Sequence, residues 1–149
     1  MNPNRIDVRQ ARATLQEDSD AIYLDVRTEA EFAEGHPENA LNIPVGTPNP
    51  ARGGLDPNPD FVQVTRLLLP LDTPLVVGCR AGPRAEAAAG ILAQAGYRNV
   101  SWVLGGYAGI SDPSGVKVAP GWVDLGFPTS RDTGDGVSYA SLRRKVGLS

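Results

Sequence analysis

The segment with the clearest capacity for chemistry is Cys79-Arg80-Ala81-Gly82-Pro83-Arg84-Ala85. It follows an apolar run typical of a buried strand and precedes a helical pattern. The first turn of a helix leaves backbone N–H groups unpaired and carries partial positive charge. A glycine such as Gly82 permits a positive φ, which turns successive N–H groups into a concave nest. We therefore expect an anion-binding loop with Cys79 at its mouth as a nucleophilic thiolate, and with Arg80 and Arg84 adding positive charge.

Two features of this segment have an alternative interpretation. Pro83 removes one N–H from the nest, but its fixed φ suits the first position of a helix, so we expect it to set the helix start. A lone cysteine after an apolar strand is also typical of a small buried hydrophobic residue. The adjacent glycine, the two arginines and the strand–loop–helix context favour the nucleophile. The same nest suits a terminal sulfur, a phosphoryl group or an arsenate.

Composition limits the classes of protein that are compatible with this chain. It has 149 residues, a formal net charge of −3 and 41% hydrophobic residues, which indicates one globular domain with a packed core. The acidic balance argues against a nucleic-acid partner. No apolar run is long enough to span a membrane, and the N-terminus does not resemble a signal peptide. One cysteine and one histidine exclude an intramolecular disulfide and the usual zinc sites, so we expect a cytoplasmic protein without metal or cofactor.

Helix and strand patterns alternate around the cysteine segment, which predicts a mostly parallel α/β sheet covered on both faces. We expect residues 1–110 to form the domain and residues 111–149 an extension of it. The expected strands are 21–24, 40–43, 75–77 and 100–103. Five helices are expected. The first is capped by Asp7, and the second is capped by Thr28 and ended by Gly35. The third has its apolar stripe on Phe61, Val64, Leu67 and Leu68; the fourth spans 83–95 with Ala88, Ile91, Leu92 and Ala95 on one face; and the last lies near 139–146. Residues 44–58 are rich in proline and glycine and are expected to be loop.

Asp25 and Arg27 end the first of these strands and are expected to lie near the cysteine loop. They suit two roles that are mutually compatible: orienting Arg84 and the loop, or forming a local ion pair that holds the next turn. His36 is expected to make a structural hydrogen bond rather than to act as a general base.

The motifs in this order resemble the rhodanese-like family. Its amino-terminal signature is similar to Asp25-Val26-Arg27, Glu31-Phe32, Gly35-His36 and Ala40-Leu41-Asn42-Ile43-Pro44, its active-site loop to residues 79–84, and its carboxy-terminal signature to Val103-Leu104-Gly105-Gly106-Tyr107. The resemblance covers roughly residues 6–110. It implies a five-stranded, mainly parallel sheet with helices on both faces. It also implies a sulfurtransferase in which Cys79 takes sulfur from a small anionic donor such as thiosulfate and passes it, as a persulfide, to a thiol or cyanide.

Departures from the family pattern keep other functions open. Ala81 stands where some thiosulfate-using members carry a basic residue, and Ala85 where many members carry Ser or Thr. Both departures weaken a specific claim for thiosulfate. Phosphatases and arsenate reductases on this scaffold have five residues between the cysteine and the arginine, and phosphatases usually have histidine before the cysteine. Here four residues separate Cys79 from Arg84, and Gly78 precedes the cysteine. We therefore rank phosphatase or arsenate reductase second, followed by a non-catalytic sulfur-sensing or binding module.

Overall fold

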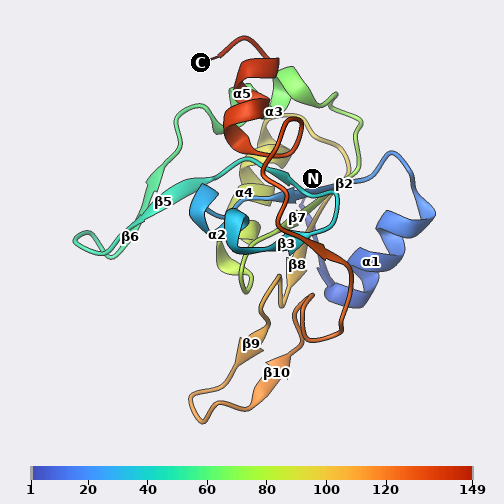
Figure 1. The fold of residues 1–149 in the computed structure, drawn as a ribbon, viewed down its shortest axis with the longest axis vertical. Coiled ribbons are helices and arrows are strands. Elements are labelled where there is room, and N and C mark those ends of the chain that lie inside the picture. Colours follow the sequence, from blue (N-terminus) through green and yellow to red (C-terminus); the bar gives the residue numbers. More distant parts are fainter. Residues whose placement is uncertain (1, 149) are drawn as a thin grey trace.

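A sheet of five parallel strands forms the centre of the computed structural model, which describes residues 2–148 (Figure 1). In sheet order the strands are β1 (Asn4–Asp7), β8 (Val100–Leu104), β7 (Leu75–Gly78), β2 (Ile22–Asp25) and β4 (Leu41–Asn42). Every neighbouring pair is parallel. The predicted α/β class with a five-stranded parallel sheet is therefore confirmed.

Helices cover both faces of this sheet. They are α1 (Val8–Glu17), α2 (Glu29–Glu34), α3 (Phe61–Leu68), α4 (Pro83–Gln94) and α5 (Tyr139–Lys145). Successive strand side chains point to opposite faces. In β7, Val77 accordingly packs with residues of α3, α4 and α5, whereas Val76 packs with α1 and α2. The sheet thus separates two apolar cores, which together hold it rigidly.

Local capping explains where the first two helices begin. Asp7 accepts a hydrogen bond from the backbone N–H of Gln10, whose side chain accepts one from the Asp7 N–H. Thr28 and Glu31 form the same reciprocal box at α2, and Gly35 ends that helix. Such boxes satisfy amides that the helix itself leaves unpaired. Both predicted caps are confirmed.

One strand was missed, and two sequence expectations are wrong in detail. Strand β1 was not predicted, because Asn4–Asp7 is short and polar and is defined only by its pairing with β8. The predicted loop contains a hairpin of β5 (Gly46–Asn49) and β6 (Gly54–Pro57), whose prolines are tolerated because both strands lie at an edge. Leu67 and Ile91 are 56% and 41% exposed. Each lies about 100° around its helix from the buried stripe.

Residues 110–138 first project away from the sheet as a hairpin and then return past residues 36–37 to α5 (Figure 1). They include β9 (Ile110–Ser111), which pairs with β10 (Lys117–Ala119), and β11 (Thr129–Ser130), which pairs with β3 (His36–Pro37). Trp122 is buried against Tyr23 and Phe127, with ring centroids 5.7 and 5.3 Å away. Across residues 2–148, none of the helices is both apolar enough and long enough to cross a membrane.

Candidate active site

The cysteine loop occupies the position that the sequence predicts. It joins the end of β7, the middle strand of the sheet, to the first residue of α4, which is Pro83. Parallel α/β sheets bind ligands beyond the carboxyl ends of their strands. The strand–loop–helix arrangement and the helix start at Pro83 are therefore confirmed.

A glycine turn between β8 and β9 holds the carbonyl groups of this loop. The backbone N–H of Gly105 donates to the Ala81 carbonyl at 2.7 Å, and that of Tyr107 donates to the Cys79 carbonyl at 2.9 Å. The N–H of Ala108 donates to the Arg80 carbonyl, also at 2.9 Å. Three consecutive loop carbonyls thus point towards one turn.

The loop amides consequently point the other way. In a planar trans peptide the C=O and N–H bonds are antiparallel, so the amides that follow these carbonyls, at residues 80–82, face away from the turn. Within residues 2–148 no backbone or side-chain acceptor binds the amides of residues 80–82, 84 or 85. A row of unpaired N–H groups beside a helix N-terminus is the backbone arrangement that binds anions.

The conformation of Gly82 differs from the expectation. Its φ is 167°, an extended value, and not the left-handed value that we predicted for the nest. The left-handed residues are Gly105 and Gly106 in the opposing turn, with φ of 101° and 51°. A Cβ on Gly106 would lie 2.4 Å from the Cys79 carbonyl oxygen. The glycine requirement therefore comes from the close approach of the turn to the loop.

Cys79 is more enclosed than the sequence indicated. Only 1% of the residue is exposed, and it contacts the apolar core on the α4 side of the sheet. Ala85, in the first turn of α4, is fully buried there as well, so it contributes to the site only through its backbone. The expected exposed position at the mouth of the nest is wrong, because Cys79 is buried.

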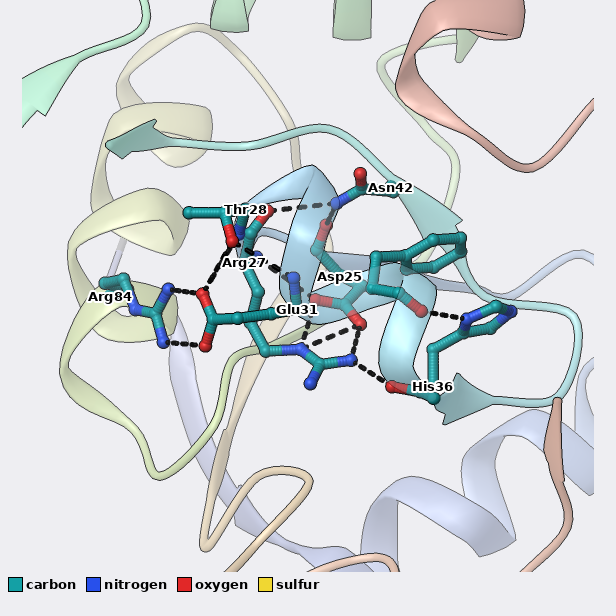
Figure 2. A network of polar contacts seen from close by, with 9 residues as sticks. Asp25, Arg27, Thr28, Glu31, His36, Asn42 and Arg84 are labelled. Atoms are coloured by element: carbon teal, nitrogen blue, oxygen red, sulfur yellow. Dashed lines mark hydrogen bonds and ion pairs between the residues drawn. The ribbon is translucent and has the colours of Figure 1, made fainter. Parts of the chain in front are cut away.

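Arg84 does not point freely into the loop. Its guanidinium forms a two-pronged ion pair with Glu31, with N–O distances of 2.6 and 3.0 Å (Figure 2). Burial alone would raise the pKa of Glu31, but hydrogen bonds from Arg84 and Thr28 outweigh it and lower the pKa to about 2. The hydrogen bond to Glu31 is the main reason why the pKa of Arg84 is raised. In the sequence Glu31 stood out as part of the amino-terminal signature and as a helix cap, because no local pattern reveals a partner 53 positions away.

Asp25 and Arg27 form a buried ion pair at the end of β2, with a shortest N–O distance of 2.7 Å (Figure 2). Arg27 also donates to the Gly35 carbonyl at 2.7 Å and lies 4.6 Å from the ring centre of Tyr107. Burial lowers the pKa of Arg27. The hydrogen bond and charge of Asp25 raise this pKa by more than burial lowers it, so the net shift is upwards. The predicted local pair is confirmed. The predicted orientation of Arg84 by these residues is wrong, because Glu31 holds that side chain.

Asn42 and His36 each bind backbone carbonyl groups near this ion pair. Asn42 donates to the carbonyls of Asp25 and Arg27 at 3.0 Å each, which fixes the path of the chain through the pair. His36 stacks on Phe32 with ring centres 3.6 Å apart, and its Nδ1 lies 2.8 Å from the Phe32 carbonyl oxygen. The structural hydrogen bond predicted for His36 is confirmed.

A cavity of about 240 Å³ opens beside the cysteine loop. Its lining includes Arg27, Glu31, Arg80 and Tyr107. Within residues 2–148, the guanidinium of Arg80 has no hydrogen-bond or ion-pair partner. Arg80 is therefore the cation that is free to meet a ligand there, whereas Arg27 and Arg84 are each neutralised by a carboxylate.

Tyr23 fills the space beside Gly78, the residue that precedes the cysteine. A Cβ on Gly78 would lie 1.8 Å from the Tyr23 hydroxyl oxygen, so no side chain fits at position 78. Burial, followed by the charge of Asp25, raises the pKa of Tyr23 well above its usual value, so the phenol is neutral. Tyr23 had been predicted only as part of a buried strand.

The residues that the structure describes contain no group of three His, Cys, Asp or Glu side chains arranged to hold a metal ion.

Comparison with known proteins adds an independent line of argument. A family model described as a rhodanese-like domain matches residues 7–112. Thiosulfate sulfurtransferase 18 of Arabidopsis thaliana is 40% identical over 130 residues, which cover 85% of this chain and 83% of that protein. Protein HIGH ARSENIC CONTENT 1, mitochondrial, from the same plant, is 39% identical over 105 residues, covering 65% of this chain and 61% of that protein.

The fold also matches a solved structure. The crystal structure of Rv0390 from M. tuberculosis superposes with a TM-score of 0.73 at 28% sequence identity. The match covers 89% of this chain and all of that one. The similarity therefore extends past the region matched by the family model.

Proposed function

Because this chain belongs to the rhodanese-like family, we propose that it is a sulfurtransferase that carries sulfur on Cys79. The Cys79 thiolate attacks the outer sulfur of a small anionic donor such as thiosulfate. The S–S bond of the donor breaks, sulfite leaves with the bonding electron pair, and Cys79 becomes a persulfide. A thiol or cyanide then attacks the terminal sulfur and releases the thiolate, which completes a covalent cycle of two half-reactions.

The orientation of the loop peptides is the observation that carries this proposal. Their carbonyls are bound by the Gly105–Ala108 turn, which leaves the amides of residues 80–82 unpaired. Pre-positioned N–H donors stabilise a negative charge that develops during a reaction more effectively than mobile water does. We propose that these amides stabilise the negative charge of the terminal persulfide sulfur.

The pairing of Arg84 changes the role that we assign to the two loop arginines. Glu31 neutralises Arg84, so Arg84 acts by fixing the start of α4 to α2. Arg80 has an unpaired guanidinium at the cavity and is the cation that we expect to meet an anionic donor.

A phosphatase or arsenate reductase is the second candidate, and one relative is named for high arsenic content. Two observations favour sulfur transfer over phosphate chemistry. Only four residues separate Cys79 from Arg84. In addition, the Tyr23 hydroxyl excludes any side chain at position 78, where phosphatases of this scaffold usually have histidine.

Intact-mass spectrometry of the purified protein tests the proposal. Incubation with thiosulfate should add one sulfur atom, and cyanide should then remove it as thiocyanate. Cys79 is the single cysteine of the chain, so the site of loading is unambiguous. Cys79→Ser should gain no sulfur while keeping the fold. If neither thiosulfate nor an organic persulfide loads the wild-type protein, the sulfurtransferase proposal is wrong.

The same preparation distinguishes the alternatives. Formation of arsenite from arsenate in the presence of a thiol, without sulfur loading, would favour the arsenate reductase. Hydrolysis of a phosphate monoester would favour a phosphatase. Absence of all three activities would leave the non-catalytic module. Location in the cytoplasm stays a prediction.

A further inference from the structure

Two peptide units of the glycine turn are bound at both ends. In the unit joining Gly106 to Tyr107, the N–H donates to the Cys79 carbonyl, and the C=O accepts from the N–H of Trp122 at 2.8 Å. In the next unit, the N–H of Ala108 donates to the Arg80 carbonyl, and the Tyr107 C=O accepts from the N–H of Val123 at 3.1 Å. Each planar unit therefore connects the cysteine loop on one side to residues 122–123 on the other.

A third contact continues this pattern by one residue. The Nζ of Lys117 donates to the Ala108 carbonyl at 2.8 Å and lies 3.1 Å from the Asp124 carboxylate. Three consecutive carbonyls of the turn, at residues 106–108, are thus bound by the segment Lys117–Asp124. We call this segment the strap. It lies beyond residue 112, where the family match ends.

The strap is itself held firmly. Trp122 is 2% exposed, packs edge-on against Tyr23, and donates from its Nε1 to the Pro128 carbonyl at 2.7 Å. The backbone N–H of Gly121 donates to the Asp124 carboxylate at 2.7 Å. A Cβ on Gly121 would lie 2.2 Å from the Gly109 nitrogen, so backbone packs directly on backbone there.

From these contacts we propose that the strap is a positioning element for the Cys79 loop. A peptide group is a rigid plane, so fixing its carbonyl fixes the direction of its N–H. Hydrogen bonds in series also polarise one another, so the strap strengthens the bonds that the turn makes to the loop carbonyls. Those bonds hold the loop amides in the orientation that binds an anion. The catalytic consequence rests on the proposed sulfur transfer, whereas the mechanical coupling does not.

Gly121→Ala is the main test. The added methyl group has to push the strap off the turn, while φ at this position needs no glycine. Gly54→Ala is the matched control, because nothing lies within 4 Å of a Cβ there. We measure amide hydrogen exchange at Tyr107 and Ala108 by NMR in the full chain. Gly121→Ala should accelerate exchange at both amides at least tenfold more than exchange at Val77 in β7, which reports global opening.

Lys117→Met gives a second test in case Gly121→Ala does not fold. Its side chain is 41% exposed, so its removal does not disturb the core. Loss of this hydrogen bond frees the peptide unit that joins Ala108 to Gly109, so exchange at the Gly109 amide should accelerate about threefold. Lys117→Arg, which keeps a donor and a charge, should restore the wild-type rate. The rate constant for sulfur loading of Cys79 should fall in Gly121→Ala and Lys117→Met, and recover in Lys117→Arg.

The two proposals fail in different ways. If wild-type Cys79 takes no sulfur, the proposed function is wrong, and the exchange rates still decide whether the strap holds the turn. If exchange at Tyr107 and Ala108 in Gly121→Ala, and at Gly109 in Lys117→Met, rises no more than at Val77, the strap is not coupled to the turn and the proposal is overturned. Unchanged sulfur loading despite faster exchange overturns the positioning role.

Discussion

The Arg84–Glu31 ion pair can be removed almost cleanly by Glu31→Gln. Glutamine at the third position of a helix serves in a capping box as glutamate does, so the bond to the Thr28 N–H is kept. The substitution therefore removes the charge that holds Arg84 and leaves the start of α2 capped. Glu31→Ala is the companion variant, since it removes both the pair and the cap.

The expected loss of stability follows from the exposure of the two side chains. Exposed ion pairs contribute about 0–1 kcal/mol, and hydrogen bonds to charged groups about 1.5–3 kcal/mol. Arg84 and Glu31 are 18% and 28% exposed and make two short contacts. We therefore expect Glu31→Gln to lower the free energy of unfolding by about 1–2 kcal/mol at pH 7. Most of this decrease should come from the lost ion pair with Arg84. Glu31→Ala should lose about 1 kcal/mol more, the usual value of an N-terminal cap.

The pH dependence identifies the ionised pair as the cause. Glu31 has a pKa of about 2 in the folded chain against a reference value of 4.5. The folded state therefore binds this proton more weakly than the unfolded state does. The resulting stability is present above pH 4.5 and is lost as the pH falls towards 2. The difference between the wild type and Glu31→Gln should be constant near neutral pH and shrink across that window.

Urea unfolding followed by tryptophan fluorescence measures this difference at each pH, with both tryptophans as reporters. A double-mutant cycle with Arg84→Met separates the coupling between the two side chains from their separate contributions. A coupling below about 0.3 kcal/mol, or a difference that does not change between pH 6 and pH 3, would refute the assignment of stability to this pair.

Three further predictions concern neighbouring parts of the site. Gly78→Ala should lower the free energy of unfolding by about 1–3 kcal/mol, because its Cβ would lie 1.8 Å from the Tyr23 hydroxyl oxygen. In a Tyr23→Ala background the same change should lower the free energy of unfolding by less than half as much. Equal decreases in the two backgrounds, measured by urea unfolding, would contradict the clash. Asn42→Asp should lower the free energy of unfolding by about 3 kcal/mol or more, because it replaces two donated hydrogen bonds by a buried carboxylate facing carbonyl oxygens. A variant that melts at the wild-type temperature would contradict this prediction. Arg80→Ala should slow loading of Cys79 from thiosulfate more than alkylation by the neutral reagent iodoacetamide, and equal effects on both rates would show that Arg80 does not meet the donor.

The sequence alone determined the features that depend on neighbouring residues. The Asp7–Gln10 and Thr28–Glu31 boxes, the helix start at Pro83 and the buried strand before Cys79 are all encoded within a few positions. Apolar runs alternating with helical stripes were sufficient for a parallel α/β sheet. Since a loop after a parallel strand emerges at the ligand-binding edge, the location of the candidate site followed as well.

The tertiary structure alone decided how that site is held. Glu31 meets Arg84 across 53 positions, and the hydroxyl of Tyr23 fills the space beside Gly78 on a neighbouring strand. Strand β1 likewise exists only because β8 pairs with it. Such contacts depend on distances between segments that are remote in the chain, and no local spacing of residue types records them. For the same reason the strap on the glycine turn became visible only in the folded molecule.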